Sequence, residues 1–427
     1  MSQLEQNQLE QNQLKQLGKN AVKVKYELQK MSTEAKDNAL YKAAEALVRN
    51  SRWIIEQNAI DIRHGEEKGM HAGLLDRLRL DEGRIRSMAE GLKQVAELPD
   101  PVGEVMETIE RPVGLHIEKR RVPIGVIGII YESRPNVTAD AFGLCFKSGN
   151  AVILKGGSDA ICSNLAITSV IREALDKEGI SKDMIQLIES TDRSVVQEFM
   201  KLREYVDLLI PRGGAGLIRS VVENSMIPVI ETGTGNCHIY VDEYADLDKA
   251  VPIIINAKTQ RIGVCNACES LVIHESVSDS LLPRLAKALK EHDVEIRGDE
   301  KVQDLIDCVP ASEEDYGTEY LDYIISMKTV SSLDEAISHI NRYNTKHSEA
   351  IITEKKEHAE RFLNEVDAAC VYVNASTRFT DGFEFGFGAE IGISTQKIHA
   401  RGPMGLRELT SYKYAIRGEG QVRGVGA

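Results

Sequence analysis

The side chain best suited to covalent chemistry in this sequence is a cysteine in a glycine-containing connection. Cys265 lies within QRIGVCNACESLVIH, after a predicted helix and before an apolar run typical of a buried strand. Reactive groups concentrate in loops held by a rigid scaffold, and a thiolate becomes a good nucleophile beside a helix N-terminus or cations. Cys268 completes a lone C-x-x-C, without the second pair or the histidines of a zinc site. We therefore expect no metal here.

A carboxylate stands beside flexible backbone in the segment VIETGTGNCHIYVD. Glu231 lies near the end of a predicted strand over 227–233, and Gly233 and Gly235 follow it. The pattern indicates a functional position without specifying a reaction.

A glycine-rich turn, Gly213-Gly214-Ala215-Gly216, lies between a predicted buried strand and a helix. Glycines let backbone N–H groups approach a phosphate at a helix N-terminus, but the same residues also suit a simple tight turn, and both interpretations stay open. The chain has no G-x-G-x-x-G in such a turn and no G-x-x-x-x-G-K-[ST]. A dinucleotide that binds here therefore binds in a variant way.

Lys155 and Ser158 follow the predicted strand over 151–154, at the edge where open α/β sheets bind ligands. A lysine there can donate hydrogen bonds to ribose hydroxyls. With no glutamate at position 158, a 2′-phosphate would meet a cation and a hydroxyl, which favours NADP(H) over NAD(H), although the neighbouring Asp159 weakens that inference. The alternative is a solvated turn lysine.

The pattern of apolar and polar residues, which predicts the elements that position these side chains, changes along the chain of 427 residues. Residues 20–98 predict consecutive helices, and strict alternation over 111–122 predicts a β-ribbon. Two series of short apolar strands and longer helices follow, which is typical of parallel sheets with helical crossovers. The tail LTSYKYAIRGEG alternates again. Because isolated ribbons are unstable in water, we expect the two alternating segments to pair with each other or across a subunit interface.

These patterns divide the chain into six predicted parts. They are a flexible N-terminal arm (1–18), a helical lead-in (19–108), a ribbon (109–122), a Rossmann-like NADP-binding domain (123–235), a catalytic domain (236–385) and a return segment with an oligomerisation strand (386–427).

Composition excludes several classes of protein. The formal net charge of −14 argues against binding nucleic acid or anionic membranes broadly, and no apolar run is long enough to span a bilayer. The N-terminus lacks the pattern of a secretory signal, so we expect a cytoplasmic location. Seven scattered cysteines do not form a disulfide framework.

Taken together, these segments resemble the aldehyde dehydrogenase superfamily. An acidic residue before a glycine-rich turn matches Glu231 to Gly235, the Gln-rich approach to a catalytic cysteine matches Gln260 to Cys265, and their separation is that of the superfamily. The resemblance selects Cys265 over Cys268. It implies an aldehyde dehydrogenase-like α/β fold, with two parallel-sheet domains and a β-ribbon for oligomerisation.

Longer segments resemble the branch of that superfamily that reduces an acyl phosphate. YESRPNVTADAFGLCFKSGNAVILKGG and NAKTQRIGVCNACESLVIH are two of them, and the likeness covers most of residues 20–417. It implies reduction of L-glutamyl 5-phosphate by NADPH to L-glutamate 5-semialdehyde and phosphate, through a thioester on Cys265, in proline biosynthesis. It also implies a homo-oligomer, a dimer or a tetramer, and allows glutamate 5-kinase as a partner that hands over the substrate.

The same resemblance assigns roles to further residues. The Cys265 N–H is the first oxyanion donor, and Glu319 matches the glutamate that holds the nicotinamide ribose. The superfamily's side-chain asparagine, the usual second donor, has no clear counterpart in YESRPN, and Asn136 is the candidate in its place. An anionic substrate needs cations, and matched segments offer Arg134, Lys258 and Arg378.

Two rival functions stay open. One is NAD(P)-dependent oxidation of a small aldehyde by water, in which Glu231 would activate the water. The other is a scaffold protein that kept the fold, against which the presence of both Cys265 and Glu231 argues.

Overall fold

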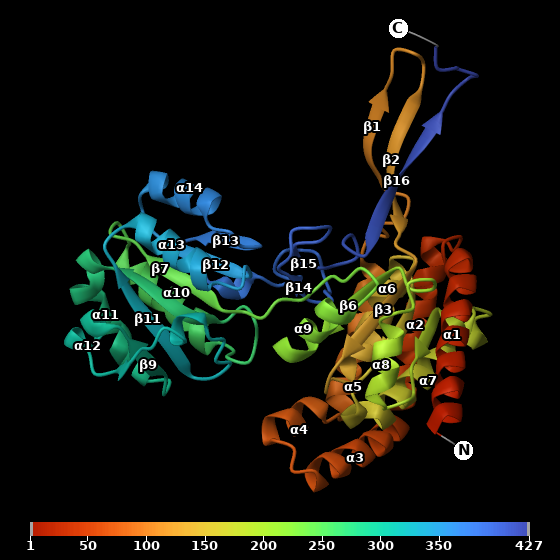
Figure 1. The fold of residues 1–427 in the computed structure, drawn as a ribbon, viewed down its shortest axis with the longest axis horizontal. Coiled ribbons are helices and arrows are strands. Elements are labelled where there is room, and N and C mark those ends of the chain that lie inside the picture. Colours follow the sequence, from red (N-terminus) through yellow and green to blue (C-terminus); the bar gives the residue numbers. More distant parts are fainter. Residues whose placement is uncertain (1–2, 425–427) are drawn as a thin grey trace. The chain divides into compact units, whose positions relative to one another are not determined.

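The computed structural model describes residues 3–424 and divides into two compact units, each built from separate stretches of chain (Figure 1). Unit 1 takes the chain up to Ile230, Phe387–Ile391 and the part from Met404 onward. Unit 2 comprises Glu231–Gly386 and Gly392–Pro403. Glu231 and Cys265 therefore belong to the same unit.

Unit 1 is built on a four-stranded parallel sheet in the order β5-β4-β3-β6. The strands are β3 (Val126–Tyr131), β4 (Ala151–Lys155), β5 (Ile185–Leu187) and β6 (Leu208–Arg212). Every residue of β3 and β4 is buried, as expected of strands covered by helices on both faces.

Helices make up most of the rest of unit 1. They are α1 (Gln3–Leu28), α2 (Thr33–Arg49), α3 (Ser51–Glu67), α4 (Ala72–Leu78), α5 (Glu82–Glu97), α6 (Asn136–Lys147), α7 (Ile161–Lys177), α8 (Arg193–Phe199) and α9 (Ala215–Asn224), with short 3₁₀ helices η1 (Ser158–Ala160) and η2 (Lys182–Met184). Side chains that accept from backbone N–H groups begin several of them, among them Ser32, Asp81 and Asp192.

Helix α1 continues through the N-terminal pentad repeat, so no boundary falls at residue 18. Leu14, Ala21 and Leu28 are buried and lie at a seven-residue interval, which is two helical turns. Within residues 3–18 the predicted arm is therefore part of helix α1, its flexibility stays a prediction, and residues 1–2 lie outside the described part. The five-residue period of the repeat does not match the helical period, so the repeat did not indicate these buried positions.

The antiparallel ribbon consists of β1 (Val105–Glu110), β2 (His116–Pro123) and β16 (Thr410–Arg417), in the order β1-β2-β16. Strand β16 pairs with β2 from Thr410 opposite Pro123 to Arg417 opposite His116. The predicted pairing of the two alternating segments is thus confirmed, and β1 adds a third strand on the other edge of β2. Tyr412, Tyr414 and Ile416 are exposed on β16.

Unit 2 contains a seven-stranded parallel sheet in the order β10-β9-β11-β8-β7-β12-β13. Its strands are β7 (Cys237–Val241), β8 (Cys268–His274), β9 (Glu295–Gly298), β10 (Val309–Pro310), β11 (Ile324–Val330), β12 (Ser348–Ile352) and β13 (Cys370–Val373). Its helices are α10 (Leu247–Thr259), α11 (Glu275–Lys290), α12 (Glu300–Leu305), α13 (Leu333–Tyr343) and α14 (Lys356–Glu365), with η3 (Asp315–Gly317) and η4 (Thr377–Phe379). A two-stranded pair, β14 (Ile393–Ser394) and β15 (Gly402–Pro403), completes it.

Alternate residues of the central strand β7 enter two different hydrophobic clusters. Ile239 and Val241 join one cluster, and Tyr240 joins another together with Phe362 of α14. Because successive strand residues point to opposite faces, these are the two faces of one buried sheet. The predicted α/β architecture with two parallel sheets and a ribbon is confirmed.

The strand predicted over 227–233 is reduced to isolated bridges. Val229 pairs with Leu209, and Thr232 pairs with Ser394. Pro228 has no N–H to donate to a ladder, which explains why the apolar run does not extend β6's sheet by a regular strand.

None of the helices within residues 3–424 combines the length and apolarity needed to cross a bilayer.

Candidate functional site

Cys265 lies in the short turn between α10 and β8, and its side chain is partly exposed. The turn includes a hydrogen bond from Ala267 N to Val264 O at 3.2 Å. Cys268 is wholly buried in β8, and burial raises the pKa of its thiol to about 12. The thiolate is the nucleophilic form, and the raised pKa of Cys268 disfavours its thiolate. The comparison therefore supports the partly exposed Cys265 as the reactive cysteine.

Gly235 supports the Cys265 turn through backbone contact. An ideal Cβ built on Gly235 would lie 1.5 Å from Cys265 O and 2.5 Å from Cys265 Cα, so only glycine fits. Cys237 Sγ donates to the same carbonyl oxygen at 3.2 Å. Burial raises the pKa of the Cys237 thiol far above its usual range, which keeps it a donor. The glycine motif that starts at Glu231 thus ends against the candidate nucleophile.

The other side of the turn is held by Asn266. Its Nδ2 donates to Thr380 O at 2.9 Å and to Arg378 O at 3.3 Å. Thr377 Oγ1 in turn donates to Asn266 O at 2.8 Å. Asn266 is buried, so these bonds fix the residue next to Cys265 to the segment around η4.

Glu319 lies beside the glycine motif. Its Oε1 accepts a hydrogen bond from Gly235 N at 2.7 Å, and burial raises the pKa of Glu319. Glu231 itself is half-buried, and its N–H donates to Gln396 Oε1 at 3.1 Å. The structure therefore brings Cys265, Glu319 and the Glu231 motif together within unit 2.

Lys258 takes part in a buried ion pair. Its side chain is fully buried, with Nζ 2.5 Å from Glu269 Oε2. The type of this residue and its position in the sequence did not reveal this burial, and its role in binding substrate stays a prediction. Glu269 Oε1 accepts from Leu321 N at 3.1 Å, and Leu321 has the positive φ of 53° that costs energy in a non-glycine residue. The pair anchors the loop that carries Glu319.

Arg378 is half-buried beside the turn. Its Nε donates to Gln260 Oε1 at 2.8 Å. Burial lowers the pKa of Arg378, and the nearby guanidinium of Arg261 lowers it further. Arg261 was not among the residues predicted for the site. Its position four residues before Cys265 could have indicated a cation near the candidate nucleophile.

In unit 1, Lys155 ends β4 and is buried, not the solvated turn lysine of the alternative interpretation. Its Nζ donates to Gly156 O at 2.7 Å, and among the described side chains no carboxylate pairs with it within 4.0 Å. Burial lowers the pKa of Lys155. An ammonium group with donors to spare fits a nucleotide cofactor's oxygen atoms, and Ser158, which begins η1, is exposed nearby in the chain.

The turn Gly213-Gly214 already holds a carboxylate. Glu132 Oε2 accepts from Gly214 N at 2.9 Å, just before α9 begins. A Cβ on Gly213 would lie 2.3 Å from the same oxygen. The sequence left a phosphate site and a simple tight turn both open here, and it did not indicate Glu132, which takes the N–H that a phosphate would use.

The remaining candidates of unit 1 flank the start of α6. Arg134 is exposed in the preceding loop. Asn136 is the first residue of α6, and its Nδ2 donates to Asp140 Oδ2 at 3.0 Å. Burial raises the pKa of Asp140 to about 6, although Asn136 opposes that shift. The roles of Arg134 and Asn136 stay predictions.

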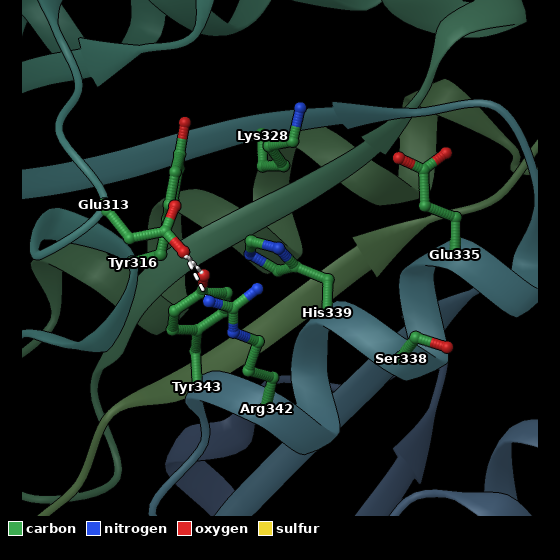
Figure 2. Close-up of a pocket in the computed structure, with 8 residues that line it drawn as sticks. All are labelled: Glu313, Tyr316, Lys328, Glu335, Ser338, His339, Arg342 and Tyr343. Atoms are coloured by element: carbon green, nitrogen blue, oxygen red, sulfur yellow. Dashed lines mark hydrogen bonds and ion pairs between the residues drawn. The ribbon is translucent and has the colours of Figure 1, made fainter.

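A separate cavity of about 280 Å³ lies over α13 of unit 2. Figure 2 shows the ring of His339 beside that of Tyr343, with Arg342 directed toward Glu313; the two rings are 4.7 Å apart, and Arg342 and Glu313 form an ion pair at 2.8 Å. Asn236 Nδ2 donates to Tyr343 O at 2.9 Å. The wall of this cavity is thus tied to the residue after Gly235, but none of the predicted site residues lines it among the residues described.

Comparison with known proteins points in one direction. The model of the aldehyde dehydrogenase family matches residues 3–307 and 305–414. The chain is 61% identical to the gamma-glutamyl phosphate reductase of Lachnospira eligens over 409 residues, which is 96% of this chain and 99% of that protein. It is 58% identical to the protein of that name from Caldanaerobacter subterraneus, over 95% of this chain and 98% of the other.

Solved structures agree with the sequence comparison. The crystal structure of gamma-glutamyl phosphate reductase from Thermotoga maritima is 54% identical in sequence, with a TM-score of 0.95 over 96% of this chain and 100% of that one. A glyceraldehyde-3-phosphate dehydrogenase from Methanocaldococcus jannaschii, solved with NADP, shares the fold at 17% identity and a TM-score of 0.67, over 96% of this chain and 95% of that one.

Proposed function

The chain belongs to the aldehyde dehydrogenase family, among its gamma-glutamyl phosphate reductases, and on that premise we propose that it reduces L-glutamyl 5-phosphate with NADPH. The products are L-glutamate 5-semialdehyde and phosphate, and the step belongs to proline biosynthesis. The observation that carries the proposal is the partly exposed Cys265, held from one side by Gly235 and from the other by Asn266.

The acyl phosphate is already activated, so no group is needed to make the leaving oxygen reactive. The Cys265 thiolate attacks the acyl carbon, the bond from that carbon to the phosphate oxygen breaks, and a thioester remains. The oxyanion of the tetrahedral species needs donors, each worth about 2.7–4 kcal/mol. We assign the Cys265 N–H as one donor and Asn136 as the second.

NADP(H) is the cofactor of the proposal, and it supplies the hydride that reduces the thioester. Lys155 and Ser158 are proposed to contact its adenosine ribose and 2′-phosphate, and Glu319 its nicotinamide ribose. The buried ammonium of Lys155, which pairs with no carboxylate among the described residues, supports this preference. Gly213 and Gly214 are proposed to contact the cofactor as well, and Gly214 N can do so only where Glu132 gives up its hydrogen bond to that N–H.

Glu231 is not needed to activate water in this reaction, because the pathway ends when the hemithioacetal releases the aldehyde and returns the Cys265 thiolate. We assign Glu231 to proton handling or to holding the cofactor. Arg134, Lys258 and Arg378 remain the proposed cations for the substrate's anionic groups, although Lys258 is buried in an ion pair with Glu269.

The proposal extends to assembly and location. The exposed aromatic edge of β16 supports a homo-oligomer, a dimer or a tetramer, formed through the ribbon. Glutamate 5-kinase is the proposed donor of the labile substrate. A reducing compartment such as the cytoplasm is the proposed location, because the seven cysteines scattered along the sequence do not form a disulfide framework.

The deciding experiment is reduction of NADP⁺ by L-glutamate 5-semialdehyde, with and without inorganic phosphate. The proposal expects turnover only when phosphate is present, because phosphate must attack the thioester in this direction. Turnover without phosphate, with glutamate as the product, would instead identify a dehydrogenase that uses water.

A further inference from the structure

Two guanidinium groups belong to the immediate surroundings of the Cys265 turn. Arg378 is bonded to it twice, through Nε to Gln260 Oε1 at 2.8 Å and through its carbonyl oxygen to Asn266 Nδ2 at 3.3 Å. Arg261 directly follows Gln260 in the chain and is exposed. The residues bonded to Arg378 thus lie on both sides of Cys265.

These two arginines differ from the other arginines of unit 2. The other five each pair with a carboxylate within 4.0 Å: Arg284, Arg297, Arg342, Arg361 and Arg401. Within the described part of the chain, neither Arg261 nor Arg378 has such a pair. An arginine left without a carboxylate beside a reactive cysteine indicates a place for an external anion.

The electrostatics agree with this geometry. Burial lowers the pKa of Arg378, and the like charge of Arg261 is the next cause; Asp381 opposes the shift more weakly. Two positive groups held together in this way create a local positive potential on a chain whose formal net charge is −14.

We infer that Arg261 and Arg378 form the binding site for the phosphate group that leaves when Cys265 attacks the substrate. The inference rests on the proposed function and adds which anionic group these cations bind. In the step concerned, the bond from Cys265 Sγ to the acyl carbon forms, the bond from that carbon to the bridging oxygen breaks, and orthophosphate leaves with the electron pair. The charge on the phosphate therefore grows as the bond breaks.

Position separates the phosphate from the substrate's other anion. The phosphate is bonded directly to the carbon that the sulfur attacks, whereas the α-carboxylate lies at the far end of the glutamyl chain. Cations attached to the residues that flank Cys265 suit the near group. Arg378 Nε is already engaged with Gln260, so its terminal nitrogens remain to bind phosphate oxygen atoms, and Arg fits such oxygen pairs as a fork.

The test uses the full-length protein in the direction of semialdehyde oxidation, with inorganic phosphate as the varied substrate. We expect Arg261→Gln to raise KM for phosphate by about tenfold or more, the loss expected for a hydrogen bond to a charged group. KM for L-glutamate 5-semialdehyde should change less than about twofold, because that substrate carries no phosphate. Arg261→Lys keeps the positive charge but loses the paired donors of the guanidinium. Its KM for phosphate should lie between that of the unchanged protein and that of Arg261→Gln.

Arg284→Gln is the matched control. It also removes one surface arginine from unit 2, but Arg284 pairs with Asp248 in the first turn of α10, about 16 Å along that helix from its end before Cys265. Both KM values should stay as in the unchanged protein.

A second measurement needs no turnover. Inorganic phosphate should slow alkylation of Cys265 by iodoacetamide in the unchanged protein, and Arg261→Gln should remove this protection. An unchanged KM for phosphate and intact protection in Arg261→Gln would overturn the assignment, as would a rise confined to KM for the semialdehyde. If the unchanged protein oxidises the semialdehyde equally well without phosphate, the proposed function itself is overturned, which is a distinct result.

Discussion

The carbonyl oxygen of Cys265 occupies the space in which any side chain at position 235 would begin. A Cβ on Gly235 would lie 1.5 Å from that oxygen, far inside van der Waals contact. Gly235 N at the same time donates to Glu319 Oε1 at 2.7 Å. One glycine therefore sets the distance between the nucleophile's backbone and the carboxylate proposed to hold the cofactor.

Gly235→Ala should abolish most activity while leaving a folded protein. The added methyl group must push the Cys265 turn away, and a displacement of about 1 Å can cost roughly a hundredfold in rate. The measurement is kcat for NADP⁺ reduction, with far-ultraviolet circular dichroism to check folding. Gly317→Ala is the control, since its Cβ would meet only Tyr343 Cδ1 at 3.7 Å; similar losses in both variants would contradict this explanation.

Glu231→Gln should reduce acyl-phosphate reduction much less than Cys265→Ser does. The thioester cannot form readily without the thiolate, whereas the proposed pathway contains no water attack for Glu231 to assist. Initial rates with NADPH and freshly generated L-glutamyl 5-phosphate compare the two variants. Equal losses would show that Glu231 acts in the chemical steps themselves.

Lys258→Met should destabilise unit 2 by about 3–5 kcal/mol, because it leaves the buried carboxylate of Glu269 without its partner. Urea unfolding followed by fluorescence measures this loss. The double variant Lys258→Met with Glu269→Leu should recover much of the stability, since no buried charge then remains. Its activity should stay low because Leu321 N loses its acceptor. Recovery of activity together with stability would exclude a role for the pair in positioning the Glu319 loop.

The pH dependence of stability should report on Asp140. Its pKa is raised by burial from the ordinary 3.8 to about 6 in the folded protein, so folding favours the protonated form. Its contribution to stability is therefore fully present below pH 3.8 and is lost as the pH rises through about 6. Asp140→Asn should flatten the unfolding free energy over this window and raise it at pH 8. Asp176→Asn, at an exposed position of α7, should keep the original slope.

The buried strands were predictable because their residue types leave few alternatives. In β3 and β4, apolar runs of strand length are bounded by polar turns, and only a sheet covered on both faces buries such a run. The pairing of β16 with β2 was also within reach, since two amphipathic alternating segments each needed a partner. In both cases the residue pattern of one segment shows what that segment needs: burial on both faces, or a partner strand.

The fate of charged residues was not predictable in the same way. Lys258 and Arg261 lie close together in the sequence, yet the first is buried against Glu269 and the second is exposed. What separates them is the position of a carboxylate on β8, which is a tertiary contact. Glu132 is a similar case: its bond to Gly214 joins residues far apart in the chain, and no spacing rule indicates it.

The ribbon has a consequence for the order in which the protein is made. Strand β2 leaves the ribosome long before β16, and a bond such as that from Arg121 Nη1 to Thr410 Oγ1 spans 289 residues. Until the last strand is synthesised, β2 carries one unpaired edge, and such edges promote association between chains. The main segment of unit 2 is already complete when β16 pairs with β2, and deletion of β16 should yield a chain prone to aggregate.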